Sequence, residues 1–125
     1  MLLKLENGMI MQVYDSDNCL YEGDTDSCEG YNLFNADGSY NDGGELDFNS
    51  NTIGKEEDLF KKVIEMATDQ NLSYEVVAYT SDCAYEDFEE LLEEEFDVED
   101  MQKLLAHIDN KDLRNLIQNK IEELR

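Results

Sequence analysis

The chain has 125 residues, of which 32 are acidic and 9 are basic, giving a formal net charge of −23. This length predicts one domain with one core, spanning residues 1–125. No apolar run approaches the roughly 18 residues of a membrane helix, and the N-terminus lacks the features of a signal peptide. An acidic surface repels phosphates and anionic lipids, which argues against direct nucleic-acid or membrane binding. We therefore expect a protein of the bacterial cytoplasm.

Residues 1–54 are predicted to be rich in β-structure. The apolar residues at 3–5 and 9–14 flank Asn7-Gly8, a strong hairpin signal. A polar loop is expected over residues 15–30.

Two more strands are expected after this loop, at residues 31–35 and 45–48. The turn signals between them lie at 36–39 and at Asp42-Gly43-Gly44. The residues at 45–48 alternate between acidic and apolar side chains, as in a strand with one buried face. The N-terminal part is thus predicted to form an antiparallel sheet of three or four strands.

Residues 55–80 are predicted to form one helix and one strand. Thr52 is placed to cap a helix that begins near Lys55, and Asn71 is a plausible stop. Apolar residues recur at helical spacing in this segment and would cover the sheet. Residues 72–80 are then expected to form a strand, with Tyr74, Val76 and Ala78 on one face.

Residues 81–125 are predicted to be helical. Ser81 or Asp82 would cap the first helix, Asp97 with Asp100 would form a capping pair for the next, and Asp109 or Asn110 would cap the last. The buried side of these helices is expected to comprise Tyr85, Phe88, Leu91, Leu92, Phe96, Val98, Met101, Leu104, Leu105, Ile108, Leu113, Leu116, Ile117, Ile121 and Leu124. The predicted fold class is α+β: an N-terminal, mainly antiparallel sheet covered by helices on one face, with a helical C-terminal third.

The charge is unevenly distributed along the chain. Residues 5–54 contain 11 acidic residues, and residues 63–102 contain 14, and neither stretch contains Lys or Arg. Residues 103–125 carry 5 basic and 4 acidic side chains. A surface that serves only solubility usually mixes both signs, so this one-sign field indicates a positively charged partner.

The densest acidic run covers residues 86–100. On a helix, Glu86, Glu90, Glu93 and Asp97 would lie along one side, about 4.5–6 Å apart along the axis. Such a row resembles the phosphates of a nucleic-acid strand, spaced about 3.4 Å apart in duplex DNA. The alternative interpretation is an ordinary solvated helix face.

A second acidic cluster lies at residues 15–29. Its carboxylates raise the alternative of a Ca²⁺-responsive loop, but the EF-hand pattern fails whether the loop is started at Asp15 or at Asp37. We expect an acidic loop that joins the main acidic surface, and no metal or other cofactor.

The sequence does not predict an enzyme. No nucleophile-elbow, phosphate-loop, dinucleotide or zinc-helix motif is present. His107 is the single histidine and is expected to be structural. None of the three cysteines, Cys19, Cys28 and Cys83, has a basic neighbour in sequence to lower its thiol pKa. Their odd number and the absence of C-x-x-C predict neither a disulfide framework nor a zinc site.

The polar face of the last helix, with Arg114 and Lys120, carries side chains of the type that read bases in DNA. An amphipathic hairpin that serves as core or as a self-association surface is the better account.

The charge, size and predicted architecture resemble small acidic proteins of phages and mobile elements, namely antirestriction and anti-CRISPR proteins that mimic DNA. This resemblance covers residues 1–102 and implies a non-enzymatic inhibitor, often dimeric, that presents carboxylates to the basic groove of a nuclease or CRISPR effector. The predicted contact residues are Glu86, Glu89, Glu90, Glu93, Glu94 and Asp97, with Asp15, Asp17, Asp24 and Asp26 as a second patch. The alternative function is a small acidic interaction adaptor without DNA mimicry, which associates through apolar strands or through the C-terminal helices.

Overall fold

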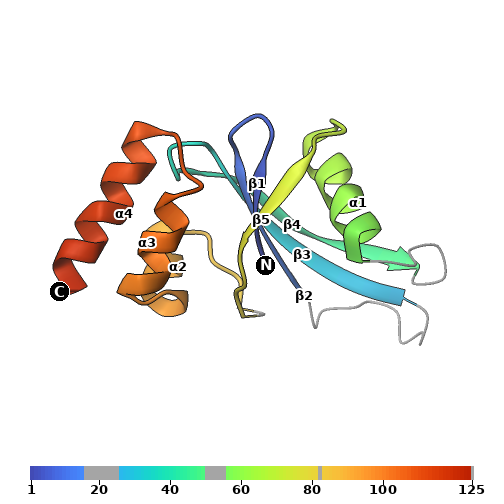
Figure 1. Ribbon diagram of the computed structural model, residues 1–125. Coiled ribbons are helices and arrows are strands. Elements are labelled where there is room, and N and C mark those ends of the chain that lie inside the picture. The colour runs from blue at the N-terminus through green and yellow to red at the C-terminus, as the bar shows by residue number, and fades with distance from the viewer. Residues whose placement is uncertain (16–25, 50–55, 82, 125) are drawn as a thin grey trace.

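The computed structural model describes residues 1–15, 26–49, 56–81 and 83–124 of the chain. Its five strands are β1 (Leu2–Leu5), β2 (Ile10–Asp15), β3 (Asp26–Phe34), β4 (Tyr40–Asn49) and β5 (Tyr74–Ala78). Its four helices are α1 (Glu56–Thr68), α2 (Phe88–Glu95), α3 (Val98–Leu105) and α4 (Lys111–Leu124). The strands form one antiparallel sheet in the order β4-β3-β2-β1-β5, so the predicted α+β class is confirmed (Figure 1).

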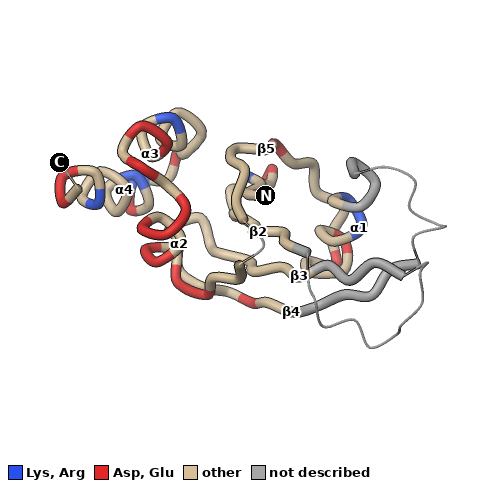
Figure 2. Tube along the Cα trace, turned by 90° about the horizontal axis from the view of Figure 1, so that it is seen from below, with Lys and Arg blue, Asp and Glu red and all other residues tan. Residues whose placement is uncertain are grey.

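Helices cover both faces of this sheet. Helix α1 lies on one face, whereas α2, α3 and α4 lie on the other (Figures 1 and 2). The prediction that all helices pack on one face is therefore wrong. The reason is in the first two strands, where Leu2 and Ile10 face the C-terminal helices while Leu3 and Met11 face α1. Strands that are apolar on both sides need cover on both sides.

The predicted hairpin at the N-terminus is confirmed. Strands β1 and β2 pair with Leu3 opposite Met11, and Gly8 adopts the left-handed conformation with φ of 92°. The backbone N–H of Gly8 donates to the carbonyl of Leu5 at 2.9 Å, which closes the turn. Glycine suits this position because a Cβ disfavours positive φ.

The turn predicted at Asp42-Gly43-Gly44 is wrong, because these residues lie inside β4 and pair with Leu33, Asn32 and Tyr31 of β3. Gly43 instead leaves room for neighbouring side chains. A Cβ on Gly43 would lie 2.4 Å from the Tyr40 hydroxyl and 2.5 Å from Oδ1 of Asn32. Glycine inside a strand commonly marks such a close approach.

Helix α1 begins near the predicted residue but ends at Thr68, before the predicted stop at Asn71. Asp69 ends the helix in the left-handed region with φ of 56°, a conformation that Asp tolerates better than most residues. The predicted cap Thr52 lies outside the described residues.

Strand β5 also differs from its predicted pattern. Its register against β1 shifts between Leu2 and Leu3, which places an extra residue, Val77, in β5. Val77 and Ala78 consequently both pack toward the C-terminal helices, which breaks the expected alternation of Tyr74, Val76 and Ala78.

The caps of the C-terminal helices confirm two predictions and correct one. Asp97 and Asp100 form a reciprocal capping box at α3, and the side chain of Asn110 accepts from the backbone of Leu113 at 3.1 Å to cap α4. The cap of α2 is Asp87 rather than Ser81 or Asp82. Asp82 is outside the described residues.

The predicted apolar positions of these helices form the larger core cluster, against Leu2, Ile10 and Phe34 of the sheet. Leu124 is the exception, being 50% exposed near the C-terminus. None of the helices formed by the described residues is long and apolar enough to cross a membrane.

Candidate protein-binding surface

Acidic residues gather along α2 and the start of α3 (Figure 2). We call this set the acidic surface. Its members are all exposed: Glu86, Asp87, Glu89, Glu90, Glu93, Glu94, Asp97, Glu99 and Asp100. The buried side of α2, formed by Phe88, Leu91 and Leu92, fixes the helix on the core. The acidic surface is therefore presented by a packed element rather than by a loop.

The prediction of a row along one side of a helix, formed by Glu86, Glu90, Glu93 and Asp97, is wrong. Glu86 precedes the first residue of α2, and Asp97 follows its C-cap. The break occurs at Phe96, which is extended with φ of −123° and ψ of 141° and only 7% exposed. Burial of this ring turns the chain into the core, and α3 then begins as a separate helix.

Two of the predicted contact residues have internal partners. The Glu93 carboxylate lies 2.5 Å from Nζ of Lys120, whose side chain is 8% exposed. Hydrogen bonds to Glu93 and Glu123 raise the pKa of the Lys120 ammonium, so this pair joins α2 to α4 as an ion pair. Asp97 is occupied in the capping box of α3. These two carboxylates hold the scaffold together and are poor candidates for contacts with a partner.

Four carboxylates of the acidic surface remain without such a role: Glu86, Glu89, Glu90 and Glu94. All four are exposed, and in the part of the chain that the structure describes no side chain forms a hydrogen bond or ion pair with them. Glu90 and Glu94 are one helical step of four residues apart, or about 6 Å along the axis. Like charges at this spacing repel each other, so the arrangement costs some helix stability.

The acidic surface continues from α2 to the nearest part of β4. Tyr40 is 42% exposed there, and burial, followed by the nearby carboxylates of Glu86 and Asp42, raises the pKa of its phenol. Glu86 and Asp42 therefore belong to one local field, although they are far apart in sequence. No sequence pattern signalled this juxtaposition.

A buried hydrogen-bond network positions the segment before α2. Gln12 of β2 is fully buried; its Nε2 donates to the Cys83 carbonyl at 2.7 Å, and its Oε1 accepts from the Tyr85 backbone N–H at 3.1 Å. Asn32 of β3 also donates to Oε1 of Gln12, at 3.3 Å. The sequence analysis missed Gln12, whose signal is a polar residue inside the apolar run Ile10-Met11-Gln12-Val13.

The second predicted patch comprises Asp15, Asp17, Asp24 and Asp26. No contact among the described residues joins it to the acidic surface. Asp15 ends β2 and Asp26 begins β3, and they enter the sheet opposite Glu29 and Asn49. Asp17 and Asp24 lie outside the described residues, as does most of the loop considered for Ca²⁺. Within the described ranges, no group of three His, Cys, Asp or Glu side chains is arranged to hold a metal ion.

The basic side chains of the C-terminal helices are also used internally. Nη1 of Arg114 donates to the carbonyls of Leu105 at 2.6 Å and of Ile108 at 2.8 Å, which ties α4 to the end of α3. Lys120 is buried in its ion pair. Two of the residues that could have read bases are thus engaged in the fold.

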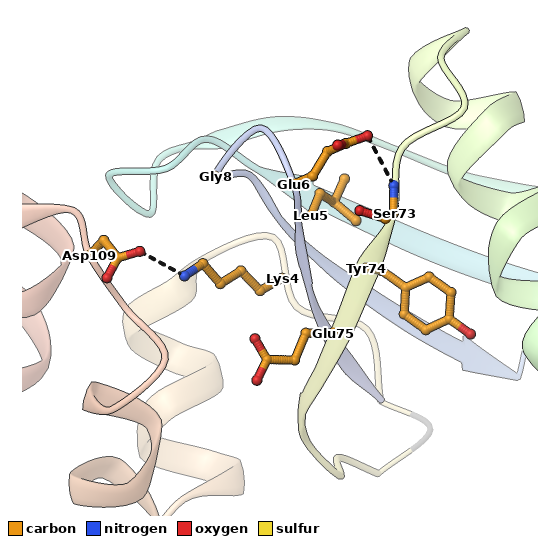
Figure 3. A pocket seen from close by; sticks show the side chains of 8 residues that line it. All are labelled: Lys4, Leu5, Glu6, Gly8, Ser73, Tyr74, Glu75 and Asp109. Carbon is orange, nitrogen blue, oxygen red and sulfur yellow. Dashed lines mark hydrogen bonds and ion pairs between the residues drawn. The ribbon is translucent and has the colours of Figure 1, made fainter.

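A polar hollow of about 360 Å³ lies between the β1–β2 turn, the start of β5 and the α3–α4 connection (Figure 3). Lys4 extends across it, and its Nζ lies 2.9 Å from the Asp109 carboxylate, which lowers the pKa of Asp109. Glu6 accepts from the backbone N–H of Ser73 at 3.2 Å. Glu75 also lines the hollow and lies 2.8 Å from Nδ1 of His107, so the single histidine links this connection to β5.

Comparisons with protein-family models, with curated proteins and with solved structures gave no match to this chain.

Proposed function

We propose that the protein is a non-enzymatic inhibitor of a nucleic-acid-binding defence enzyme, such as a restriction nuclease or a CRISPR effector. Its acidic surface would occupy the basic groove in which that enzyme holds DNA or RNA. The observation that carries the proposal is a set of four exposed carboxylates, three on α2 and one two residues before it, that have no side-chain partner among the described residues. They repel one another, and a basic groove would relieve that repulsion.

The scaffold around α2 supports this proposal. Phe88, Leu91 and Leu92 bury one side of the helix, Asp87 caps its first turn, and Lys120 ties it to α4. A rigid carboxylate array meets a groove without the cost of ordering a loop. The net charge of −23 would also steer the protein toward a positive partner and make association sensitive to salt.

The test is capture of partners from a bacterial lysate with a salt-gradient elution. We expect a basic nuclease or effector to elute at moderate salt and to be displaced by added duplex DNA. The double variant Glu90→Lys and Glu94→Lys should lose this partner. Its matched control, Glu65→Lys and Glu122→Lys, changes the net charge equally on exposed sites of α1 and α4 and should retain the partner.

The result would contradict the proposal if both double variants lost the partner equally, because net charge alone would then explain binding. Failure of added duplex DNA to displace the partner would also contradict the proposal. Glu93 and Asp97 are left unchanged in this test because their loss would disturb the ion pair to Lys120 and the α3 cap.

A second candidate function is the interaction adaptor that does not mimic nucleic acid. It is favoured by exposed apolar side chains away from the acidic surface, with Met66 46%, Val76 37% and Tyr79 81% exposed. Partner binding that survives about 0.5 M salt would support it, because exposed charge pairs are screened within a few ångströms there.

A further inference from the structure

The sheet ends at β5, which is paired with β1 on one side and has no strand on its other side among the described residues. Figure 2 shows this edge at the end of the sheet opposite β4. The backbone N–H of Glu6 donates to the Ser73 carbonyl at 3.0 Å, so the backbone carbonyl of Ser73 points toward the β1 side. Backbone groups along an antiparallel strand point alternately toward and away from the neighbouring strand. The backbone N–H and carbonyl of Glu75 therefore point toward β1, and those of Val76 point away from it.

This edge has little of the protection that sheet edges usually carry. Proteins guard exposed edges with charged side chains, especially Lys, or with bulges. Strand β4, at the other end, contains Asp42, Glu45 and Asp47. Strand β5 contains one charged residue, Glu75, which is held by His107 on the helix side. The bulge at Val77 limits regular pairing to residues 73–76 and does not cover them.

Besides Glu75, apolar side chains are exposed at this edge. Val76 is 37% exposed, and Tyr79, just after the strand, is 81% exposed. Added strands gain affinity from main-chain hydrogen bonds and specificity from side chains at alternate positions. The β5 edge thus offers both outward backbone groups and an apolar contact.

Charge decides which strand fits this edge. A second copy of the chain would bring a net charge of −23 against −23. At the start of β5, the hollow in Figure 3 is lined by the carboxylates of Glu6, Glu75 and Asp109 and by one amine, that of Lys4. Asp109 is paired with Lys4 and Glu75 with His107, so the carboxylate of Glu6 and the net charge of −23 favour a cationic side chain on the incoming strand. We propose that the outer edge of β5 pairs with an extended segment of a partner protein in which apolar and Lys or Arg residues alternate.

The proposal does not rest on the function assigned to the acidic surface, and a synthetic peptide tests it directly. The probe is a fluorescent peptide of about ten residues in which Lys and Val alternate. Its control has the same sequence and charge but carries N-methyl groups on alternate residues, which remove the donors of one edge. We expect the unmodified peptide to bind roughly tenfold more tightly by anisotropy, since neutral hydrogen bonds are lost in the control. Bound peptide should also slow amide hydrogen exchange at Val76.

Variants at Val76 give the second readout. Val76→Lys places a like charge on the edge and should weaken peptide binding several-fold, whereas Val76→Thr keeps a β-branched side chain and should bind within about twofold. Circular dichroism checks that both variants are folded. Glu90→Lys with Glu94→Lys should leave peptide binding to β5 intact, so this test and that of the acidic surface can fail separately.

Three results would overturn the proposal. Equal binding of the N-methylated peptide would show that attraction is only electrostatic. Slowed exchange on α2 instead of β5 would place the peptide on the acidic surface. Sedimentation that shows a dimer, abolished by Val76→Lys, would make a second copy the occupant of the edge.

Discussion

Replacing Gln12 with leucine tests whether the buried polar network holds the segment before α2 in place. Gln12 is fully buried, so Gln12→Leu keeps a similar volume but leaves the Tyr85 backbone N–H and the Asn32 amide without their partner. The carbonyl of Cys83, an exposed residue, also loses its donor. Each buried orphan costs about 1–3 kcal/mol. The 3.3 Å bond to Asn32 is the longer one, and leucine gains about 1 kcal/mol of apolar burial. We expect a net loss of about 2–4 kcal/mol in the free energy of unfolding.

Urea unfolding followed by circular dichroism measures this loss. With a slope of about 1.5 kcal/mol per molar urea, the midpoint should fall by about 2 M without a change in slope. The exposed Gln102→Leu is the matched control and should stay within about 0.5 kcal/mol of the parent. The double variant Gln12→Leu with Asn32→Leu should recover part of the loss, because both partners of one bond are then apolar. A Gln12→Leu loss under about 0.5 kcal/mol would refute the reasoning.

Three further predictions concern caps, backbone strain and pH. Asp97→Ala should cost about 1 kcal/mol in urea unfolding by removing the α3 cap, whereas Glu94→Ala should change little; equal effects would argue against the cap. Asp69→Ala should lower the midpoint relative to Asp69→Gly, because alanine tolerates φ of 56° poorly; the reverse order would contradict this. Lys4 lowers the pKa of Asp109 in the folded state. The stabilisation that this ion pair gives the fold is therefore fully present above the carboxyl pKa of the unfolded chain, and it is lost as the pH falls through the lower pKa of the folded state. The stability difference between the parent and Lys4→Met should therefore narrow below about pH 4, and a constant difference would show that the pair contributes nothing pH-dependent.

Local signals in the sequence were sufficient for several elements. Asn7-Gly8 predicted the first hairpin because glycine supplies the positive φ that the turn needs. Asp97 and Asp100 predicted the start of α3 because the capping box involves neighbouring residues. The helical spacing of apolar residues likewise predicted the C-terminal core, since it depends on one periodicity.

Features that depend on a partner distant in sequence were predicted wrongly or not at all. Asp42-Gly43-Gly44 has turn composition, but it lies inside a strand, where Gly43 makes room for Tyr40 and Asn32. The acidic run suggested a row of carboxylates on one helix side, but Glu86 precedes α2 and Asp97 follows its C-cap, the buried Phe96. Whether a carboxylate is free or paired, as Glu93 is with Lys120, depends on which helices meet.

The sequence by itself determined the charge of −23, the α+β class and the ends of several elements, because composition, periodicity and capping are properties of short segments. Only the tertiary structure decided that helices cover both faces of the sheet, that Gln12 anchors the segment before α2, and that β5 forms an open edge. These features arise from contacts between residues far apart in the chain, and such contacts are set by how the whole core packs.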